Sequence, residues 1–289
     1  MISIIIPLFN KEKSIIRTIE SVLLQSYEDF EIVIVNDGSN DNSISLIRDI
    51  NDERIKIYHQ INSGVSAARN TGINKSLGEW LLFLDADDIL LPNCLQTLVD
   101  LITNFNVKIA AANYYTFDLK GKKYKYINSF KSGIITNLHK NFFLKNFYLR
   151  MGNSLFHKSV FNDLKFNTNL KRYEDYELFF KIYNSVISIA ISQKPVMIYT
   201  HDYGSLALDF SKLEGDYINY LNFEQSTFWE KMNLSLLYSQ GENIYSDKRL
   251  SEKYKEYISY KFIAEFIVFW LKGYRKFLRF SFDYFRKIS

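Results

Sequence analysis

The chain has 289 residues, 47% of them hydrophobic and 24% charged, which is enough to bury a sizeable core in one large domain or two. Its single cysteine, Cys94, excludes an intramolecular disulfide and a cysteine-based metal site. The formal net charge is +4, but residues 247–289 alone carry a net of +6, so the basic character belongs to the C-terminal end.

The N-terminal residues enter a strand-like run, 1–6, without the basic and long apolar regions of a signal peptide, so we expect none. No window of about 18 uncharged apolar residues is present, which argues against a transmembrane helix. We therefore expect a cytoplasmic protein, either free or held peripherally at the inner face of the cell membrane.

Apolar runs alternate with helical patterns over the first part of the chain. Strands are expected at 3–6, 30–35, 55–58 and 80–84, and helices at 13–25, 43–50 and 66–75. Strands that are apolar throughout and separated by helices indicate a parallel sheet covered on both faces. Because ligands of such sheets bind beyond the carboxyl ends of the strands, the loops after the first, second and fourth strands should share one rim.

The pattern becomes less regular beyond Pro92, which suits the first turn of a helix with Asp88 near its cap. Later elements are expected as a strand at 107–112, a hairpin at 114–126, a helix at 175–183, and strands at 186–191 and 196–199. Pro7 should end the first strand, and Pro195 should divide the last two. From about residue 205 no strand pattern remains, and the chain is expected to be helical.

An acidic loop follows the fourth strand. Four apolar residues, 81–84, lead directly into Asp85, Asp87 and Asp88. Burial of unpaired carboxylates is costly, so these groups need water, a cation or a helix N-terminus. Since Mg²⁺ prefers one or two carboxylates plus substrate oxygens, Asp85 and Asp87 are candidate ligands of an ion that holds phosphates. A solvated acidic turn is the alternative.

Five short motifs follow one another in the order of a known family. They are Ile6-Pro7-Leu8-Phe9-Asn10, Val35-Asn36-Asp37-Gly38-Ser39, Asn62 to Asn70, Leu84-Asp85-Ala86-Asp87-Asp88 and Glu174-Asp175. Together they make residues 2 to about 205 resemble the family 2 glycosyltransferases. The resemblance implies a GT-A fold, a Rossmann-like α/β architecture with a mostly parallel central sheet. It also implies transfer of a sugar from a nucleotide diphosphate with inversion.

The resemblance also implies a donor site. Asp87 would bind Mn²⁺ or Mg²⁺, Asp85 would lie against the ribose or assist the metal, and Asp37 would accept a hydrogen bond from uracil. The implied donor-binding residues are Pro7, Leu8, Asn10, Asp37, Asn62, Arg69, Asp85 and Ala86. The Gly64 turn ahead of a helix adds backbone N–H groups on the phosphate side. An ordinary turn at 36–39 and a surface position for Arg69 are the alternatives.

On the acceptor side, the resemblance makes Asp175 the base that deprotonates the acceptor hydroxyl, with Glu174 orienting the base or the acceptor. The alternative is that both acids only stabilise a helix N-terminus. His201 is implied as a ligand of the metal or diphosphate, although one extra residue separates it from Ser205 compared with the family pattern. Residues 150–153 lie where acceptor contacts are expected.

The C-terminal end is a separate amphipathic segment. On a helical wheel its charged residues form one stripe of net charge +4: Lys261, Glu265, Lys272, Arg275, Lys276, Arg279, Asp283 and Arg286. The remaining apolar arc is wider than one core contact requires. We expect contact with a membrane surface or a partner, whereas a helical cap or a homodimer contact is the alternative.

The sequence thus predicts three regions: a nucleotide-sugar-binding half at 1–110, an acceptor-binding half at 111–204 and an all-helical extension at 205–289. The expected activity is hexosyl or N-acetylhexosaminyl transfer from a UDP-sugar to a glycan or lipid-linked acceptor in bacterial capsule, lipopolysaccharide or O-antigen synthesis. A non-catalytic nucleotide-sugar or glycan-binding module is the alternative. A nucleotidyltransferase is disfavoured because residues 7–11 lack its Gly/Arg-rich loop. No nucleic-acid partner is expected.

Overall fold

The structure is a computed structural model that describes residues 1–117, 123–125, 132–147, 149–200, 216–224, 226–245, 248–257 and 259–268. His201 and residues 269–289, which carry most of the basic stripe, therefore lie outside the described residues.

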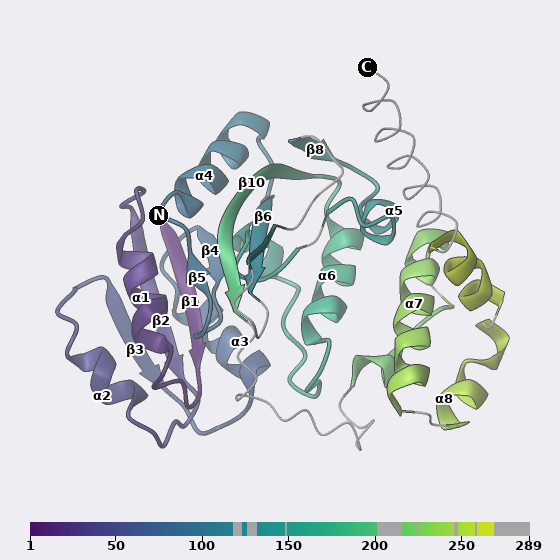
Figure 1. The fold of residues 1–289 in the computed structure, drawn as a ribbon, viewed down its shortest axis with the longest axis horizontal. Helices are drawn as coiled ribbons and strands as arrows, with labels where there is room; N and C mark the ends of the chain where they lie inside the picture. Colours follow the sequence, from purple (N-terminus) through teal and green to yellow (C-terminus); the bar gives the residue numbers. More distant parts are fainter. Residues whose placement is uncertain are drawn as a thin grey trace, which may run out of the picture.

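A single sheet runs through the molecule in the order β3-β2-β1-β4-β9-β6-β10-β5 (Figure 1). Its N-terminal half is parallel and consists of β1 (Ile2–Leu8), β2 (Phe30–Asn36), β3 (Ile55–His59) and β4 (Trp80–Phe83). The intervening helices are α1 (Ile15–Leu23), α2 (Ser43–Arg48) and α3 (Val65–Lys75). The predicted alternation of strands and helices in this half is confirmed.

The second half of the sheet is mixed. β9 (Ser154–His157) lies antiparallel between β4 and β6 (Ile109–Phe117), and β10 (Ile189–Thr200) runs parallel to β6. β5 (Ile89–Leu90) and β8 (Gly133–Ile135) pair antiparallel with β10, and β7 (Lys123–Lys125) forms the predicted hairpin with β6. Both proposed halves therefore contribute to one continuous sheet, and the α/β architecture is confirmed.

Helices cover both faces of this sheet. The remaining ones are α4 (Cys94–Phe105), α5 (Leu138–Phe143), α6 (Glu174–Ser185), α7 (Phe228–Tyr245), α8 (Lys248–Lys253) and an unlabelled helix at 259–268. Short 3₁₀ turns occupy Lys158–Phe161, Tyr217–Tyr220 and Lys255–Tyr257. The described residues after 216 contain only helices and loops, as predicted.

Strand β1 shows why its sequence is apolar at successive positions. Ile4 and Ile6 pack in the core beneath α1 and α4, whereas Ile5 packs in the opposite core with residues of α3 and α6. Successive side chains of a strand point to opposite faces, so both must be apolar when both faces are covered. Helix α3 approaches closely at Gly72, where an added Cβ would lie 2.2 Å from Ile5 Cγ2.

Two predicted strand boundaries at prolines are wrong. Pro7 lies inside β1 and is paired in register with Val35, while the pairing of β1 with β4 ends at Ile5. Its missing N–H is therefore tolerated near the end of the ladder. Pro195 does not divide two strands, because β10 continues through it with register shifts on either side. A bulge of this kind absorbs the lost donor without ending the strand.

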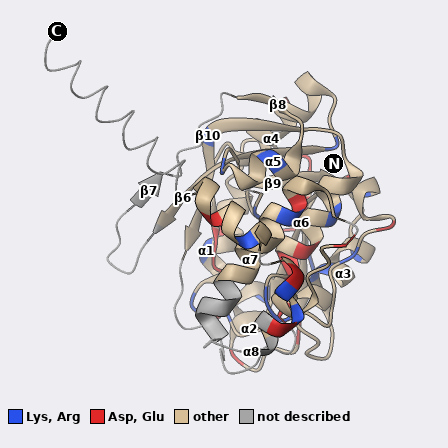
Figure 2. Cartoon of the chain, turned by 90° about the vertical axis from the view of Figure 1, so that its right-hand side faces the viewer, with Lys and Arg blue, Asp and Glu red and all other residues tan. Residues whose placement is uncertain are grey.

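The C-terminal helices form a group at one end of the sheet, beside α6 and α5 (Figure 1). Ala264 of the last described helix is fully buried against Phe143 and Met232. Phe262 and Phe266 on the same helix are 61% and 68% exposed. Figure 2 views the molecule from the end where these helices lie, and acidic and basic residues are interspersed over the helices on that side. In the described part of the chain, no helix has the length and apolar character that crossing a membrane requires.

Candidate active site

The loops after β1 and β2 are bonded to each other through side chains. The N–H of Asn10 donates to Ser39 Oγ (3.1 Å), and Asn10 Oδ1 accepts from the N–H of Asn40 (2.9 Å). The N–H of Lys11 donates to Ser43 Oγ at 2.9 Å. Asn10 has a positive φ of 52°, a conformation that asparagine tolerates better than most residues. These bonds fix the first loop on the rim of the sheet.

Asp37, at the carboxyl end of β2, organises the start of α3. Its carboxylate accepts hydrogen bonds from Gln60 Nε2 (2.7 Å) and from the N–H groups of Ser63 and Gly64 (both 2.8 Å). Gly64 has φ +89°, which favours glycine at this turn. These bonds use three of the about four acceptor positions of a carboxylate, and the Asp37 side chain is buried. The role of Asp37 in reading the base stays a prediction.

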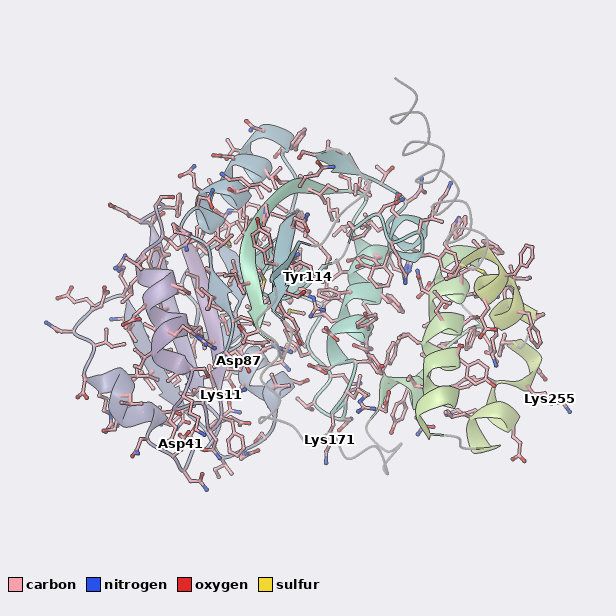
Figure 3. The ribbon with its side chains drawn as sticks, viewed as in Figure 1. Lys11, Asp41, Asp87, Tyr114, Lys171 and Lys255 are labelled. Atoms are coloured by element: carbon pink, nitrogen blue, oxygen red, sulfur yellow. The ribbon has the colours of Figure 1, made fainter. Side chains whose placement is uncertain are left out.

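The acidic loop after β4 alternates between exposed and buried side chains. Asp85 and Asp87 are partly exposed, whereas Ala86 and Asp88 are buried. Asp87 Oδ2 accepts from Lys11 Nζ at 2.5 Å, and the main-chain oxygen of Asp87 accepts from Arg17 Nη2 at 3.1 Å. Figure 3 shows Lys11 and Asp87 beside each other at the carboxyl end of the parallel strands.

Asp88 is not the helix cap that the sequence predicted. Helix α4 begins at Cys94 with Asn93 at its N-cap position, and Pro92 precedes the helix. Asp88 instead accepts a hydrogen bond from the N–H of Thr200 (2.9 Å), which fastens the end of β10 to the acidic loop. Burial and the nearby Asp85 raise the pKa of Asp88 well above its usual value.

Arg69 connects the donor side of the rim to the predicted catalytic acids. Its side chain is almost fully buried, with Nη2 2.9 Å from Asp85 Oδ1 and Nη1 3.1 Å from Glu174 Oε1. Its guanidinium also lies over the ring of Phe166 at 5.3 Å. Burial alone would lower the pKa of Arg69, but Asp85 and Glu174 more than offset it and raise that pKa. Arg69 is therefore a buried link between two carboxylates, not a surface helix residue.

Glu174 and Asp175 lie in the first turn of α6, where acids are also favoured by the helix dipole. The residue before them, Tyr173, has a positive φ of 56°, a costly conformation for a non-glycine residue that is enriched at functional sites. Asp175 Oδ1 accepts from the N–H of Tyr176 at 2.9 Å. The acids thus occupy a strained helix start that faces Arg69.

The pKa of Asp175 is strongly perturbed by its surroundings. Burial and the neighbouring Glu174 raise the pKa of Asp175 to about 7, against the opposing effects of Arg69 and Arg150. Arg150 is itself held over the rings of Tyr199 (4.1 Å) and Tyr114 (5.0 Å). A carboxylate that titrates near neutral pH suits general-base catalysis.

The other predicted donor-site residues surround the same rim. Pro7 is partly buried and Asn62 is exposed, with Asn62 N only 3.0 Å from a Cβ built at Gly38. The side chains of Leu8 and Ala86 lie in the core. Contacts from these two residues to a nucleotide would therefore come from their main chains.

The predicted acceptor residues 150–153 divide into two kinds. Met151 and Asn153 are buried, and Asn153 Nδ2 donates to the Ala112 carbonyl at 2.7 Å, which is a structural role. An added Cβ at Gly152 would lie 2.9 Å from Met197 Sδ. Arg150 interacts electrostatically with Asp175.

The chemistry of the acidic loop fits a hard divalent ion bound together with phosphates. Asp85 and Asp87 offer carboxylate oxygens at the strand end, the donor type that Mg²⁺ and Mn²⁺ prefer. Within the described part of the chain, no group of three or more His, Cys, Asp or Glu side chains could hold a metal. An ion at Asp87 would therefore need ligands beyond the described side chains, and donor phosphates are of the right type.

Three residues of the site were missed from sequence. Lys11 pairs with Asp87, Gln60 pairs with Asp37, and Tyr199 stacks on Arg150. Lys11 directly follows Asn10 in a predicted rim loop, so its position beside the acids was available from the strand order. The positions of Gln60 and Tyr199 depend on the geometry of a loop and a strand end, and no pattern in the sequence indicated them.

Comparison with known proteins agrees with this fold. The profile described as "Glycosyl transferase family 2" matches residues 3–165. Glycosyltransferase GlyA of Streptococcus pneumoniae serotype 4 is 33% identical over 218 residues, which are 71% of this chain and 31% of GlyA. Glycosyltransferase GlyG of the same organism is 35% identical over 121 residues, covering 41% of this chain and 40% of GlyG.

A solved structure shares the fold over most of the chain. S. aureus TarS 1–349 in complex with UDP-GlcNAc aligns with a TM-score of 0.69 and 21% identity, covering 91% of this chain and 79% of TarS 1–349. This chain spans about a third of the length of GlyA. Since the profile covers more than half of the residues, the chain belongs to glycosyl transferase family 2 and has the GT-A fold.

Proposed function

We propose that the chain is an inverting glycosyltransferase that moves a sugar from a UDP-sugar to a hydroxyl group of a glycan or lipid-linked acceptor. One observation carries the proposal: the buried side chain of Arg69 bridges Asp85 and Glu174, so the donor-side acid and the acid beside Asp175 belong to one network of ion pairs. The pKa of Asp175, raised to about 7 by burial and by Glu174, is that of a usable general base.

In this proposal, the oxygen of the acceptor hydroxyl attacks the anomeric carbon on the side opposite the leaving diphosphate. Asp175 accepts the proton of that hydroxyl during the attack. Glu174 holds Arg69 and thereby helps to fix the geometry of Asp175 and Asp85. Asp37 accepts a hydrogen bond from the base. A Mn²⁺ or Mg²⁺ ion held by Asp87, assisted by Asp85 and His201, would supply electrostatic stabilisation of the leaving diphosphate.

The donor and setting follow from similar proteins and are part of the proposal. TarS was solved with UDP-GlcNAc, so UDP-GlcNAc is the first donor to test, followed by other UDP-hexoses and UDP-N-acetylhexosamines. Assembly of a bacterial surface polysaccharide is the proposed setting, on the resemblance to the family alone.

The test is a panel of UDP-sugars measured with and without Mn²⁺. We expect one donor to bind more tightly with Mn²⁺ than without it and to release UDP slowly through hydrolysis even when no acceptor is supplied. UDP-sugar binding without UDP release, in the presence of glycan acceptors, would instead favour a non-catalytic binding module. Failure of every UDP-sugar to bind would contradict the proposed donor class.

We also propose that the last described helix contacts a membrane surface. Phe262, Ile263 and Phe266 are exposed on it, and the basic residues that follow in sequence would favour anionic lipid headgroups. We expect F262S/F266S to reduce co-sedimentation with anionic liposomes, whereas Tyr220→Ser, which removes an exposed aromatic residue elsewhere, should not. Equal co-sedimentation of all three proteins would contradict membrane contact through this helix and favour a partner or dimer contact.

A further inference from the structure

The Lys11–Asp87 ion pair lies where the proposed metal would bind. Lys11 Nζ is 2.5 Å from Asp87 Oδ2, and both side chains are only 15% exposed. A cationic group of the protein thus already occupies an oxygen of the carboxylate that is proposed to hold the metal.

The main chain on both sides of this ion pair is held in place. The Lys11 N–H donates to Ser43 Oγ, and the Lys11 carbonyl accepts from the N–H groups of Ser14 and Ile15 at the start of α1. On the other side, Arg17 Nη2 donates to the main-chain oxygen of Asp87. The ammonium group therefore reaches Asp87 from an anchored loop, which lowers the entropic cost of the contact.

We infer that Lys11 competes with the divalent ion for Asp87, so that the ion binds tightly only together with the donor diphosphate. The inference rests on the proposed function, which places the ion at Asp87. Without nucleotide, an incoming ion must displace the ammonium from the carboxylate against charge repulsion. A diphosphate adds oxygen ligands for the ion and gives the displaced ammonium another anionic partner.

This arrangement makes ion and nucleotide binding mutually dependent. By thermodynamic linkage, the factor by which UDP tightens Mn²⁺ binding equals the factor by which Mn²⁺ tightens UDP binding. Removal of the ammonium takes away one competitor of the ion for the Asp87 carboxylate before nucleotide arrives. Part of the coupling should therefore disappear, because Mn²⁺ alone then binds more tightly.

The test is titration of Mn²⁺, followed by electron paramagnetic resonance of the free ion, with and without UDP. For the native protein we expect UDP to tighten Mn²⁺ binding by about tenfold or more. For Lys11→Met we expect Mn²⁺ alone to bind about tenfold more tightly than to the native protein, with a smaller gain from UDP. Lys11→Arg retains a cation and should keep weak binding of Mn²⁺ alone.

Arg17→Gln is the matched control, because Arg17 is a cation beside the same residue that contacts its main chain and not its carboxylate. It should bind Mn²⁺ alone like the native protein. The inference is overturned if UDP tightens Mn²⁺ binding equally in the native protein and in Lys11→Met. If UDP binds but Mn²⁺ binds to neither protein in the presence of UDP, the proposed metal role of Asp87 fails as well. Failure of the inference and failure of the proposed metal role therefore give different results.

Discussion

Asp175→Asn is expected to lower the rate of sugar transfer by a factor of about 10² to 10⁴, the usual contribution of a positioned general base. The amide keeps the shape and can still accept the Tyr176 N–H bond, but it cannot accept the acceptor proton. UDP-sugar affinity should stay nearly unchanged, since Asp175 is proposed to act on the acceptor and not on the nucleotide. Transfer assays and UDP-sugar titration measure the two quantities separately.

Glu177→Gln is the control for this substitution. Glu177 is a third acid in the first turn of α6 and pairs with Lys181, so it shares the helix-dipole environment of Asp175 without facing Arg69. Its loss should leave transfer nearly intact. If Glu177→Gln and Asp175→Asn reduce transfer equally, the acids serve mainly to stabilise the helix start.

The raised pKa of Asp175 predicts opposite pH trends for enzyme activity and for protein stability. With the pKa of Asp175 at about 7, kcat/KM should rise with pH and level off above that value. Because the folded-state pKa lies above the unfolded one, the group contributes stability that is fully present below pH 4 and lost as pH rises through about 7. In thermal melts, Asp175→Asn should lack this loss of stability with rising pH. The prediction is contradicted if the melting temperatures of the native protein and the variant change with pH in the same way.

Arg69→Met should destabilise the fold by about 1–3 kcal/mol, less than the loss of one partner of a fully buried ion pair, because Asp85 is 38% exposed to water. It leaves two carboxylates without their guanidinium partner: that of Glu174, which is 15% exposed, and that of the more exposed Asp85. Because Arg69 also lowers the pKa of Asp175, its loss should move the rise of kcat/KM to higher pH. Denaturant unfolding and pH–rate profiles measure the two effects.

Arg54→Met provides the comparison at a more exposed site. Arg54 pairs with Asp52 at 2.8 Å and lies over the Phe30 ring at 4.5 Å, but its side chain is 35% exposed. Its removal should cost less than about 1 kcal/mol, as is usual for solvated ion pairs. Equal destabilisation by Arg69→Met and Arg54→Met would show that the Arg69 bridge stabilises the fold no more than an exposed ion pair does.

The parallel half of the fold was predictable because both faces of its strands are buried, which leaves uninterrupted apolar runs in the sequence. The errors came from local signals that tertiary structure overrides. Pro7 and Pro195 suggested strand ends, yet each lies where the ladder already stops or shifts on one side. Asp88 suggested a helix cap, but it bonds to Thr200, more than one hundred residues away in sequence.

The candidate site was only partly visible from sequence. Strand order placed Asp37, Asp85 and Asp87 on one rim, because parallel strands end on the same edge. Asp175 was assigned from the family resemblance alone. It could not show that Arg69 points between two carboxylates, since that depends on the packing of α3 at Gly72 and on the position of α6.

The position of β9 in the sheet determines when the sheet can close during synthesis of the chain. β9 is the strand that joins β4 to β6, and it pairs with each over only a few residues. Strands β1 to β4 are made well before residues 154–157, so one edge of β4 must wait for a partner. Unpaired edges promote association between chains. Nascent chains that stop before β9 should therefore be prone to aggregation, and Glu174 and Asp175 are synthesised only after that edge can close.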